Sequence, residues 1–531
     1  MKLNAPVCRH FLWPTLGALL LGAIVARGPD YFVQFAALLL IFGLPALPRL
    51  FLSPLVPFER LARGFIDSFL INLALVVVSV LCRFELRPLL YFAALLGITL
   101  VRMAWLLRSA RPAAGKLVVL SRPAILGAIL VVLAALLLNL WGALKVVPVL
   151  QDHDSVMECP TYGLAKTLKP YCIETRVPYS FAKGPTAHFC YAFPLLLTDR
   201  LERVKHYYDT SLRSLELPNF KKQIVGLWHG EFKGWFPRQT GQVLLETRTT
   251  SIFLSATLCL LLFLALSEIT GSSAASLLLT LLFMTLPEIF VRDSYAGYQN
   301  ASNIFLLIGI VQFMRHRETW IVPILLATTN QKAVIILGAA CALWILWQQR
   351  SIKKLFSSRT LWGLFLGMSL LYAYGYAIRP PSLLQDQFEH HGVDRLLHRN
   401  PLPGMHYPSV PELWREFAFN YGPLLIMCGV AAGLLLWRRR RDHAEELLLM
   451  LVILVTAAAF SAVDWKMTKH LDLMIPALIL LLGRGWQLVQ PWRGPRRVAL
   501  TVTTTGLFLY NGWIIWHLTQ DFAWLKVLPI W

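Results

Sequence analysis

Charged residues are scarce in this chain of 531 residues, since Asp, Glu, Lys and Arg together make up 15% of it and hydrophobic residues 56%. A soluble multidomain protein of this length needs far more polar surface, so the composition excludes one. The mean hydropathy is +0.57, and apolar runs of about 20 residues, the length that crosses a bilayer core, recur along the sequence. The chain is therefore predicted to be an all-α polytopic membrane protein.

Acidic residues are also few, with 29 Asp and Glu against 50 Lys and Arg, which gives a formal net charge of +21. The positive residues lie between the apolar runs and do not form one basic domain. If the runs alternate across the membrane, these residues fall on one side, as the positive-inside rule describes. This placement favours cytoplasmic loops and argues against nucleic acid as a partner. The clusters are Lys2 and Arg9; Arg49, Arg60 and Arg63; Arg108, Arg111, Lys116 and Arg122; Arg315 and Arg317; Arg350, Lys353, Lys354 and Arg359; Arg438 to Arg441; and Arg484, Arg493, Arg496 and Arg497.

The eight cysteines show no metal-ligand spacing. Cys159, Cys172 and Cys190 lie in one polar segment, where a disulfide between Cys159 and Cys172 is one of the alternatives in an oxidising compartment. The other cysteines lie in or beside apolar runs and are expected to be small buried apolar residues. The first apolar run ends without an A-x-A-like cleavage site, so it is expected to be a retained span and not a cleaved signal.

About 15 apolar runs have the character of membrane-spanning helices. They lie at residues 11–26, 31–48, 64–82, 88–107, 124–146, 251–267, 273–291, 301–314, 319–329, 333–347, 361–378, 421–437, 444–463, 470–483 and 498–517. With the N-terminus inside, segment 147–249 and loop 379–420 are outside. The first of these is nearly balanced in charge and rich in aromatic residues, which indicates a folded extramembrane element.

Two carboxylates, Asp152 and Asp154, follow the fifth apolar run within a few residues. A carboxylate at the membrane surface can deprotonate a hydroxyl group or bind a divalent cation. The alternative is an ordinary solvated loop. Downstream, Tyr162 lies in a stretch that can form an interfacial helix, and Lys183 and His188 flank a Gly-Pro pair that precedes a second apolar helix.

This layout resembles the GT-C glycosyltransferases, above all the protein O-mannosyltransferases and the lipid A aminoarabinose transferases. The likeness continues in four short motifs. They are TRTTS at 247–251, similar to an Arg-x-x-Ser motif; PEIFVRDS at 287–294; ATTNQK at 327–332, similar to a Leu-Thr-Lys turn; and KHLDLMIP at 469–476, similar to an Arg-Tyr helix with a later Pro. The chain departs from the common pattern in having Asp-His-Asp for Asp-Glu and Lys-His for Arg-Tyr.

The resemblance divides the chain into three parts. Residues 1–115 form a four-helix transmembrane extension, residues 116–485 form the GT-C-like core with the outer segment 147–249 and the outer loop 379–420, and residues 486–531 form a last helix and tail. The Leu- and Arg-rich composition and the lack of a cleavable signal fit an integral protein of a bacterial inner membrane, with its active site facing the periplasm. An endoplasmic reticulum protein is the alternative. The partners that the resemblance implies are membrane lipids, a lipid-linked sugar donor and a glycan, lipid or protein acceptor.

The implied reaction moves a sugar from a polyprenyl-phosphate donor to a hydroxyl group at the outer membrane face. It inverts the configuration at the sugar carbon. Asp154 is the preferred base and Asp152 the second catalytic carboxylate. The residues implied to bind the donor phosphate are Lys332, Arg292, Lys466 and Lys469. Those implied to bind the acceptor are His188, Lys183, Tyr162, Asp293, Asn300 and His470. A divalent cation would take Asp152, Asp154 and His188.

Structural roles are the alternatives for several of these residues. Arg292 and Asp293 can pair with each other at a helix end, and His188 can serve in packing. Asn300 can cap a helix. Lys466 and Lys469 can be interfacial lysines whose stems lie along the lipid. For loop 379–420, a zinc site is the alternative to a polar cover over the acceptor entrance.

Two other functions remain open. A transporter or flippase of lipid-linked glycans would use charges buried within helices, broken helices and internal repeats. No convincing repeat is visible in the sequence, and its charges cluster at one face. An O-antigen-ligase-type enzyme would use a similar donor and a large late outer loop, of which loop 379–420 is a modest version.

Overall fold

The computed structural model describes residues 16–23, 25, 30–53, 55–109, 120–146, 156–168, 184–203, 238–295, 297–378, 409–438, 444–462, 471–491 and 494–520. Regular structure within these ranges is helical, and no strand occurs in them. Eight of the described helices are long and apolar enough to cross a membrane, or nine if the bent pair at 273–293 is one span. This supports the predicted helical membrane protein. The other predicted runs form shorter or less apolar helices or lie partly outside the described residues, so the total of about 15 spans stays a prediction.

The helices follow one another along the chain in two groups. The first contains α2 (Asp30–Leu38), continued by the π-helical η1 (Leu39–Gly43), α3 (Leu47–Leu52), α4 (Pro57–Leu81), α5 (Pro88–Ser109), α6 (Arg122–Trp141), continued by the π-helical η2 (Gly142–Val146), α7 (Val156–Thr167) and α8 (Pro185–Leu197). The second contains α11 (Arg238–Thr270), α12 (Ser273–Met284), α13 (Pro287–Asp293), α14 (Gln299–Met314), α15 (Ile321–Ala327), α16 (Gln331–Gln349), α17 (Ile352–Leu355), α18 (Arg359–Ile378), α21 (Val410–Arg438), α22 (Ala444–Ala462), the 3₁₀ turn η7 (Asp472–Met474), α24 (Ile475–Val489) and α25 (Pro495–Gln520).

Two helices begin earlier than the sequence predicts. Helix α11 starts at Arg238, so the last residues of the predicted outer segment are helical and continuous with the span. Helix α21 likewise starts at Val410, within the predicted outer loop. Hydropathy marks where a helix becomes apolar, but a polar stretch without a breaking signal can continue the same helix outward.

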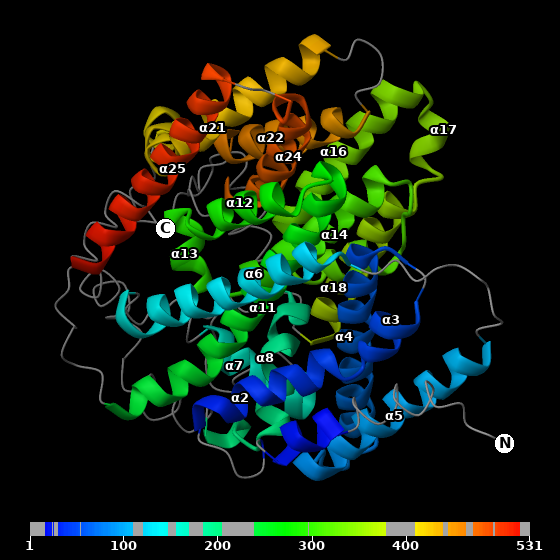
Figure 1. Cartoon of the computed structure of the whole chain (residues 1–531). Coiled ribbons are helices and arrows are strands. Elements are labelled where there is room, and N and C mark those ends of the chain that lie inside the picture. The colour runs from blue at the N-terminus through cyan, green and yellow to red at the C-terminus, as the bar shows by residue number, and fades with distance from the viewer. Residues whose placement is uncertain are drawn as a thin grey trace.

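Helix α11 is the central helix of the described fold. It contacts α6, α12, α14 and α24 (Figure 1). Its most apolar stretch is 72% buried, whereas that of α5 is 22% buried and forms part of the outer surface. Leu254, Leu258 and Leu262 have no exposed surface. Arg248 and Ser251, which precede these leucines on α11, are also buried and are therefore held in the interior of the bundle.

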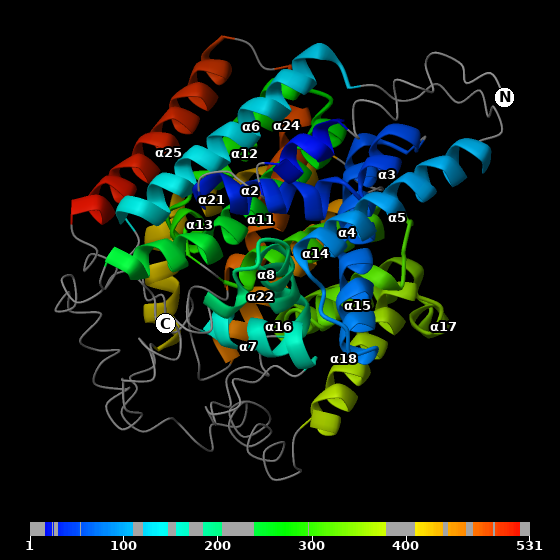
Figure 2. The same ribbon diagram turned by 90° about the horizontal axis from the view of Figure 1, so that it is seen from below.

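The N-terminal helices pack into the same apolar core as the rest of the described chain. Phe42 stacks on Phe253 of α11 at a centroid distance of 5.7 Å, and Phe69 meets Phe305 of α14 edge to face at 6.2 Å. Figure 2 shows α2 and α4 beside α11, in agreement with their contacts. These N-terminal helices therefore pack directly against α11 and α14.

Basic residues that the topology places inside find acidic partners at one set of helix ends. At the end of α14, Arg315 pairs with Glu268 of α11 at 2.5 Å, and Arg317 pairs with Glu59 of α4. Arg484, near the end of α24, pairs with Glu446 at the start of α22 at 2.8 Å. The opposite ends of α11, α14 and α24 carry the candidate site.

Most described cysteines lie where the sequence predicts. Cys259, Cys341 and Cys428 are buried free thiols, as expected for small apolar residues, and Cys190 of the predicted outer segment is a buried free thiol as well. Cys82 is the exception, because it ends α4 and is exposed. The predicted alternative of a disulfide between Cys159 and Cys172 lies outside the described side chains.

Candidate functional site

The chain bends at the break between α12 and α13, and the charged residues of α13 lie in the interior of the protein. The two helices meet at an angle of 74°, and Pro287 begins α13 after Leu286, which is extended (φ −62°, ψ 126°). Proline has no backbone N–H and disfavours a helical conformation at the preceding residue, so the helix cannot run through this point. As a result Glu288, Arg292 and Asp293 are 5%, 4% and 2% exposed.

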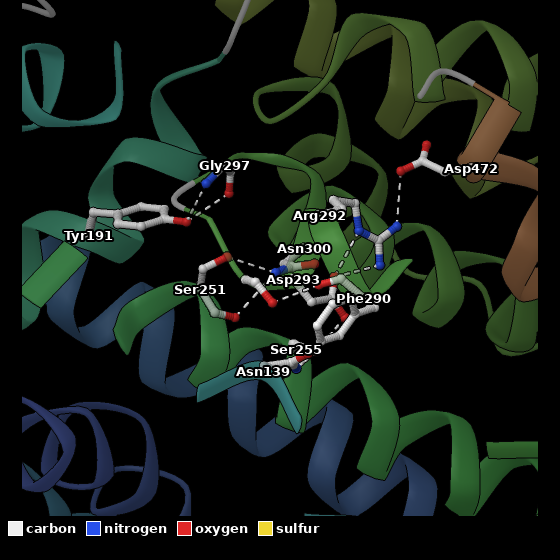
Figure 3. Close-up of polar contacts among 11 residues, drawn as sticks. Asn139, Tyr191, Ser251, Ser255, Phe290, Arg292, Asp293, Gly297, Asn300 and Asp472 are labelled. Carbon is white, nitrogen blue, oxygen red and sulfur yellow. Dashed lines mark hydrogen bonds and ion pairs between the residues drawn. The ribbon is translucent and has the colours of Figure 1, made fainter. Parts of the chain in front are cut away.

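Arg292 lies between two carboxylates (Figure 3). Its Nε donates to Oδ1 of the neighbouring Asp293 at 2.8 Å, and its Nη1 donates to Oδ2 of Asp472 at 2.9 Å. Nη2 also lies 2.8 Å from Oδ1 of Asp293. The predicted alternative of an Arg292–Asp293 pair is what the structure shows, with Asp472 of η7 as an additional partner.

The same network continues from Asp293 into the two long helices behind it. Ser255 of α11 donates through Oγ to Oδ2 of Asp293 at 2.5 Å. Asn139 of α6 donates through Nδ2 to Ser255 Oγ at 2.9 Å. Figure 3 shows this chain of contacts running from Asn139 to Asp472. Four elements, α6, α11, α13 and η7, are thereby joined through buried polar side chains.

The end of the fifth predicted span lies against α13. A Cβ atom on Gly142 would come within 2.1 Å of Ser294 Oγ and 2.9 Å of the Phe290 ring, so only glycine permits this approach. Arg248 donates through Nη1 to the carbonyl of Ala143 at 2.8 Å. The described chain stops at Val146, a few residues before Asp152 and Asp154, and both of these aspartates lie outside the described residues.

The start of α8 packs on the turn between α15 and α16. Gly184 N–H donates to the Thr329 carbonyl at 3.1 Å and Thr186 N–H to the Thr328 carbonyl at 3.2 Å. Lys332 lies in the first turn of α16, which Asn330 caps by accepting the Lys332 N–H at 3.0 Å. Lys183, the residue before Gly184 in the sequence, lies outside the described residues.

Three further contacts tie these segments together. Tyr191 of α8 donates through its hydroxyl to the Gly297 carbonyl at 2.7 Å. Asn300 donates through Nδ2 to Ser251 Oγ at 2.9 Å, and Asn330 donates through Nδ2 to Ser302 Oγ at 3.0 Å. The predicted capping role of Asn300 is wrong, because α14 begins after Tyr298 and no side chain caps it.

Of the remaining predicted site residues, His188 and Tyr162 have described side chains and three others do not. His188 is fully buried within α8, and its carbonyl accepts from Thr161 at 3.4 Å. The Tyr162 hydroxyl donates to Glu202 at 3.1 Å, at the other end of α8 from the α15–α16 turn. Lys466, Lys469 and His470 lie outside the described residues.

A metal site was predicted only as a possibility for Asp152, Asp154 and His188. Among the side chains that the structure describes, no group of three His, Cys, Asp or Glu residues is arranged to hold a metal ion. Because the two aspartates lie outside those residues, the divalent cation stays a prediction.

Sequence reasoning missed several buried polar residues near this network. The motif around Asp472 does not indicate a role for this residue, and no sequence motif includes Tyr421 of α21, which lies close enough to interact with Glu288 and Asp472. The amides of Gln299, Asn303 and Asn420 are at most 4% exposed, and no described residue bonds to them. A useful signal was present for Gln299 and Asn303, since polar residues four positions apart share one face of an otherwise apolar helix.

The contact between α8 and the α15–α16 turn gives a first test. A Cβ atom at Gly184 would lie 1.8 Å from the Thr328 carbonyl oxygen, so Gly184→Ala forces the two segments apart and is expected to cost at least about 1–3 kcal/mol. Thermal unfolding in detergent measures this. Gly506→Ala, at a helical position with open space around it, is the control and should not lower the midpoint, because alanine favours a helix more than glycine does. An unchanged midpoint for Gly184→Ala would contradict the packing.

Comparison of the chain with models of protein families, with curated proteins and with solved structures gave no match.

Proposed function

We propose that this protein is a GT-C-type glycosyltransferase, which moves a sugar from a polyprenyl-phosphate donor to a hydroxyl acceptor at the outer membrane face. The observation that carries the proposal is the convergence of segments that are far apart in the sequence. Residues 142–146, 184–191, 248–251, 290–300 and 328–332 meet through the hydrogen bonds and close approaches described above. Four of these five segments carry the motifs of the resemblance, and the fifth leads into Asp152 and Asp154.

The chemistry of such a donor sets what the site must supply. A polyprenyl chain holds its phosphate at the membrane interface, so the reacting groups must lie at helix ends on one side. Asp154 takes the proton of the acceptor hydroxyl while that oxygen forms a bond to the sugar carbon. The bond from this carbon to the phosphate oxygen breaks, the electron pair leaves with polyprenyl phosphate, and the configuration inverts. The negative charge on the leaving phosphate then needs a cation.

We assign this cation to Lys332 and give Arg292 a positioning role. Arg292 is already engaged by Asp293 and Asp472, so binding a phosphate would require it to leave a buried carboxylate. Lys332 lies in the first turn of α16, where the helix dipole adds to its attraction for an anion. Lys466 and Lys469 remain further candidates for the phosphate.

The buried amides offer partners for the hydroxyl groups of a sugar. A buried polar group without a hydrogen bond costs about 1–3 kcal/mol. Gln299 and Asn303 of α14 and Asn420 of α21 have no partner among the described residues. We propose that water or sugar hydroxyl groups satisfy these amides during the reaction cycle.

A transporter or flippase is the second candidate, because the broken α12–α13 pair with buried charges at the break is a feature of transporters. Proteoliposomes that contain a fluorescent polyprenyl-phosphate sugar distinguish the two functions. A flippase makes the inner-leaflet label accessible to a membrane-impermeant quencher and leaves the lipid intact. The proposed transferase instead releases polyprenyl phosphate once an acceptor hydroxyl is supplied, without moving the label between leaflets.

Donor binding tests the role of Lys332. Lys332→Ala is expected to weaken the affinity for a polyprenyl-phosphate sugar by about tenfold or more, since a charge-assisted hydrogen bond is worth roughly 1.5–3 kcal/mol. Lys332→Arg should retain most of the affinity. Lys353→Ala, at an exposed lysine of the short helix α17, is the matched control. Equal donor affinity for Lys332→Ala and the unmutated protein would make Lys332 a structural residue.

A further inference from the structure

Unpaired buried amides are concentrated in the first turns of α14. Gln299 and Asn303 are 4% and 0% exposed, and neither the amide oxygen nor the amide nitrogen of either side chain has a hydrogen-bond partner among the described residues. The amide oxygen of Asn300 is unpaired as well, although its nitrogen is bonded. Beyond these residues α14 is almost entirely apolar. Because protein interiors contain only a few such groups per 100 residues, five unpaired atoms within residues 299–303 require an explanation.

Contacts on the other sides of α14 fix the direction of the two fully unpaired amides. Phe305 faces α4, Asn300 faces α11 and Ser302 faces the turn between α15 and α16. Successive residues of an α-helix are rotated by about 100°, so Gln299 and Asn303, four positions apart, share a face. This face lies between α11 and the α15–α16 turn and is directed away from α4.

The polar turns of α14 are joined to the proposed phosphate site. Asn330 donates through Nδ2 to Ser302 Oγ at 3.0 Å, and its Oδ1 accepts the Lys332 N–H at 3.0 Å. Ser302 directly precedes Asn303 in α14. In a polyprenyl-phosphate sugar the sugar is bonded directly to the phosphate. A phosphate bound at Lys332 would therefore bring the donor sugar, before any acceptor, to the first turns of α14.

The Gln299 amide also lies beside the Arg292 network. A Cβ atom on Gly297 would be 2.4 Å from Gln299 Oε1 and 2.8 Å from the ring of Tyr295, so the amide and the ring meet at this glycine. Tyr295 is in turn close enough to interact with Arg292. The unpaired amides thus belong to the same end of the bundle as the candidate site.

We infer that Gln299 and Asn303 bind hydroxyl groups of the donor sugar, so that the protein binds the sugar-bearing lipid more tightly than the polyprenyl phosphate left after transfer; this inference rests on the proposed function. An amide donates and accepts hydrogen bonds, as a sugar hydroxyl does. Both amides are closed off from solvent in this structure, so the sugar reaches them when α14 separates from the elements facing it. The unpaired groups favour this opening, because they have no hydrogen bonds to lose. Once the sugar has left, the product lacks these contacts and dissociates more readily.

The test is an affinity ratio measured on the full chain in detergent. It compares polyprenyl phosphate with the tightest binder among polyprenyl-phosphate glucose, galactose and mannose of the same chain length. The sugar-bearing lipid is expected to bind at least about tenfold more tightly, since each neutral hydrogen bond contributes a factor of about two to ten. In the double variant with Gln299→Met and Asn303→Leu this ratio should fall at least about fivefold. Lys332→Ala should weaken the binding of both lipids and leave the ratio unchanged.

Thermal unfolding separates sugar recognition from packing. The double variant should not lower the unfolding midpoint, because it replaces unpaired buried amides by apolar side chains of similar size. Gln312→Met is the matched control, since this amide of α14 accepts from Thr319 at 3.0 Å. Its loss should lower the midpoint and leave the affinity ratio unchanged.

Two results would overturn the inference. One is equal affinity of the unmutated protein for polyprenyl phosphate and for all three sugar-bearing lipids, a comparison that does not depend on how any variant folds. The other is an unchanged ratio in the double variant, which would make both amides structural. Sugar-selective binding without transfer to a supplied acceptor would instead contradict the proposed transferase and leave the sugar-binding role of Gln299 and Asn303 in place.

Discussion

Replacing Arg292 by methionine is expected to destabilise the fold by about 3–5 kcal/mol, the usual consequence of removing one member of a buried ion pair. Arg292 is 4% exposed, and it is the described cation that contacts both Asp293 and Asp472. Without it two carboxylates are left buried together, and their mutual repulsion adds to the loss of hydrogen bonds. Thermal unfolding of the detergent-solubilised protein measures the effect.

Two further variants separate charge from packing. In the triple variant with Arg292→Met, Asp293→Asn and Asp472→Asn, the charges are removed together, so most of the lost stability should return. Arg102→Met removes a partly exposed partner of Asp67 and should cost at most about 1 kcal/mol. If Arg292→Met and Arg102→Met have the same small effect, Arg292 does not hold α13 and η7 together.

Asp154→Asn is expected to lower the rate of sugar transfer by about 10²–10⁴-fold, the contribution that general bases typically make. The amide keeps the shape of the side chain but cannot take the proton of the acceptor hydroxyl. Donor affinity should remain within about twofold, since this step follows binding. The measurement is the rate of polyprenyl phosphate release in the presence of acceptor.

Asp199→Asn is the matched control for this variant. Asp199 is exposed, lies in the same predicted outer segment and adopts a left-handed conformation (φ 56°), which asparagine tolerates as well as aspartate does. Full activity of Asp199→Asn with loss in Asp154→Asn supports the assignment. Near-normal activity of Asp154→Asn would shift the role of base to Asp152.

The helices were largely predictable because their apolar runs match the thickness of a bilayer. Helices α4, α5 and α6 begin or end within a few residues of the predicted spans. The starts of α11 and α21 were not predictable in this way, since their first turns are polar. Pro287 signals a break in α12–α13, but the sequence does not specify an angle of 74°.

The candidate site was predictable only in its parts. The short motifs named Arg292, Asp293 and Lys332, yet the partner of Arg292 lies 180 residues away in a different motif. No local pattern connects Arg292 with Asp472, or Gly184 with Thr328, because these contacts arise from how the helices pack. Tyr162 shows the converse, since a suitable residue in a suitable segment donates instead to Glu202.

The most direct measurement of the proposed function is mass spectrometry of the lipids that copurify with the solubilised protein, followed by incubation of the protein with that same extract. We expect a polyprenyl-phosphate monosaccharide that is consumed by the unmutated protein and not by Asp154→Asn. This result would identify the donor sugar as well. A bound lipid-linked oligosaccharide that is never consumed would contradict the transferase and favour a flippase or ligase.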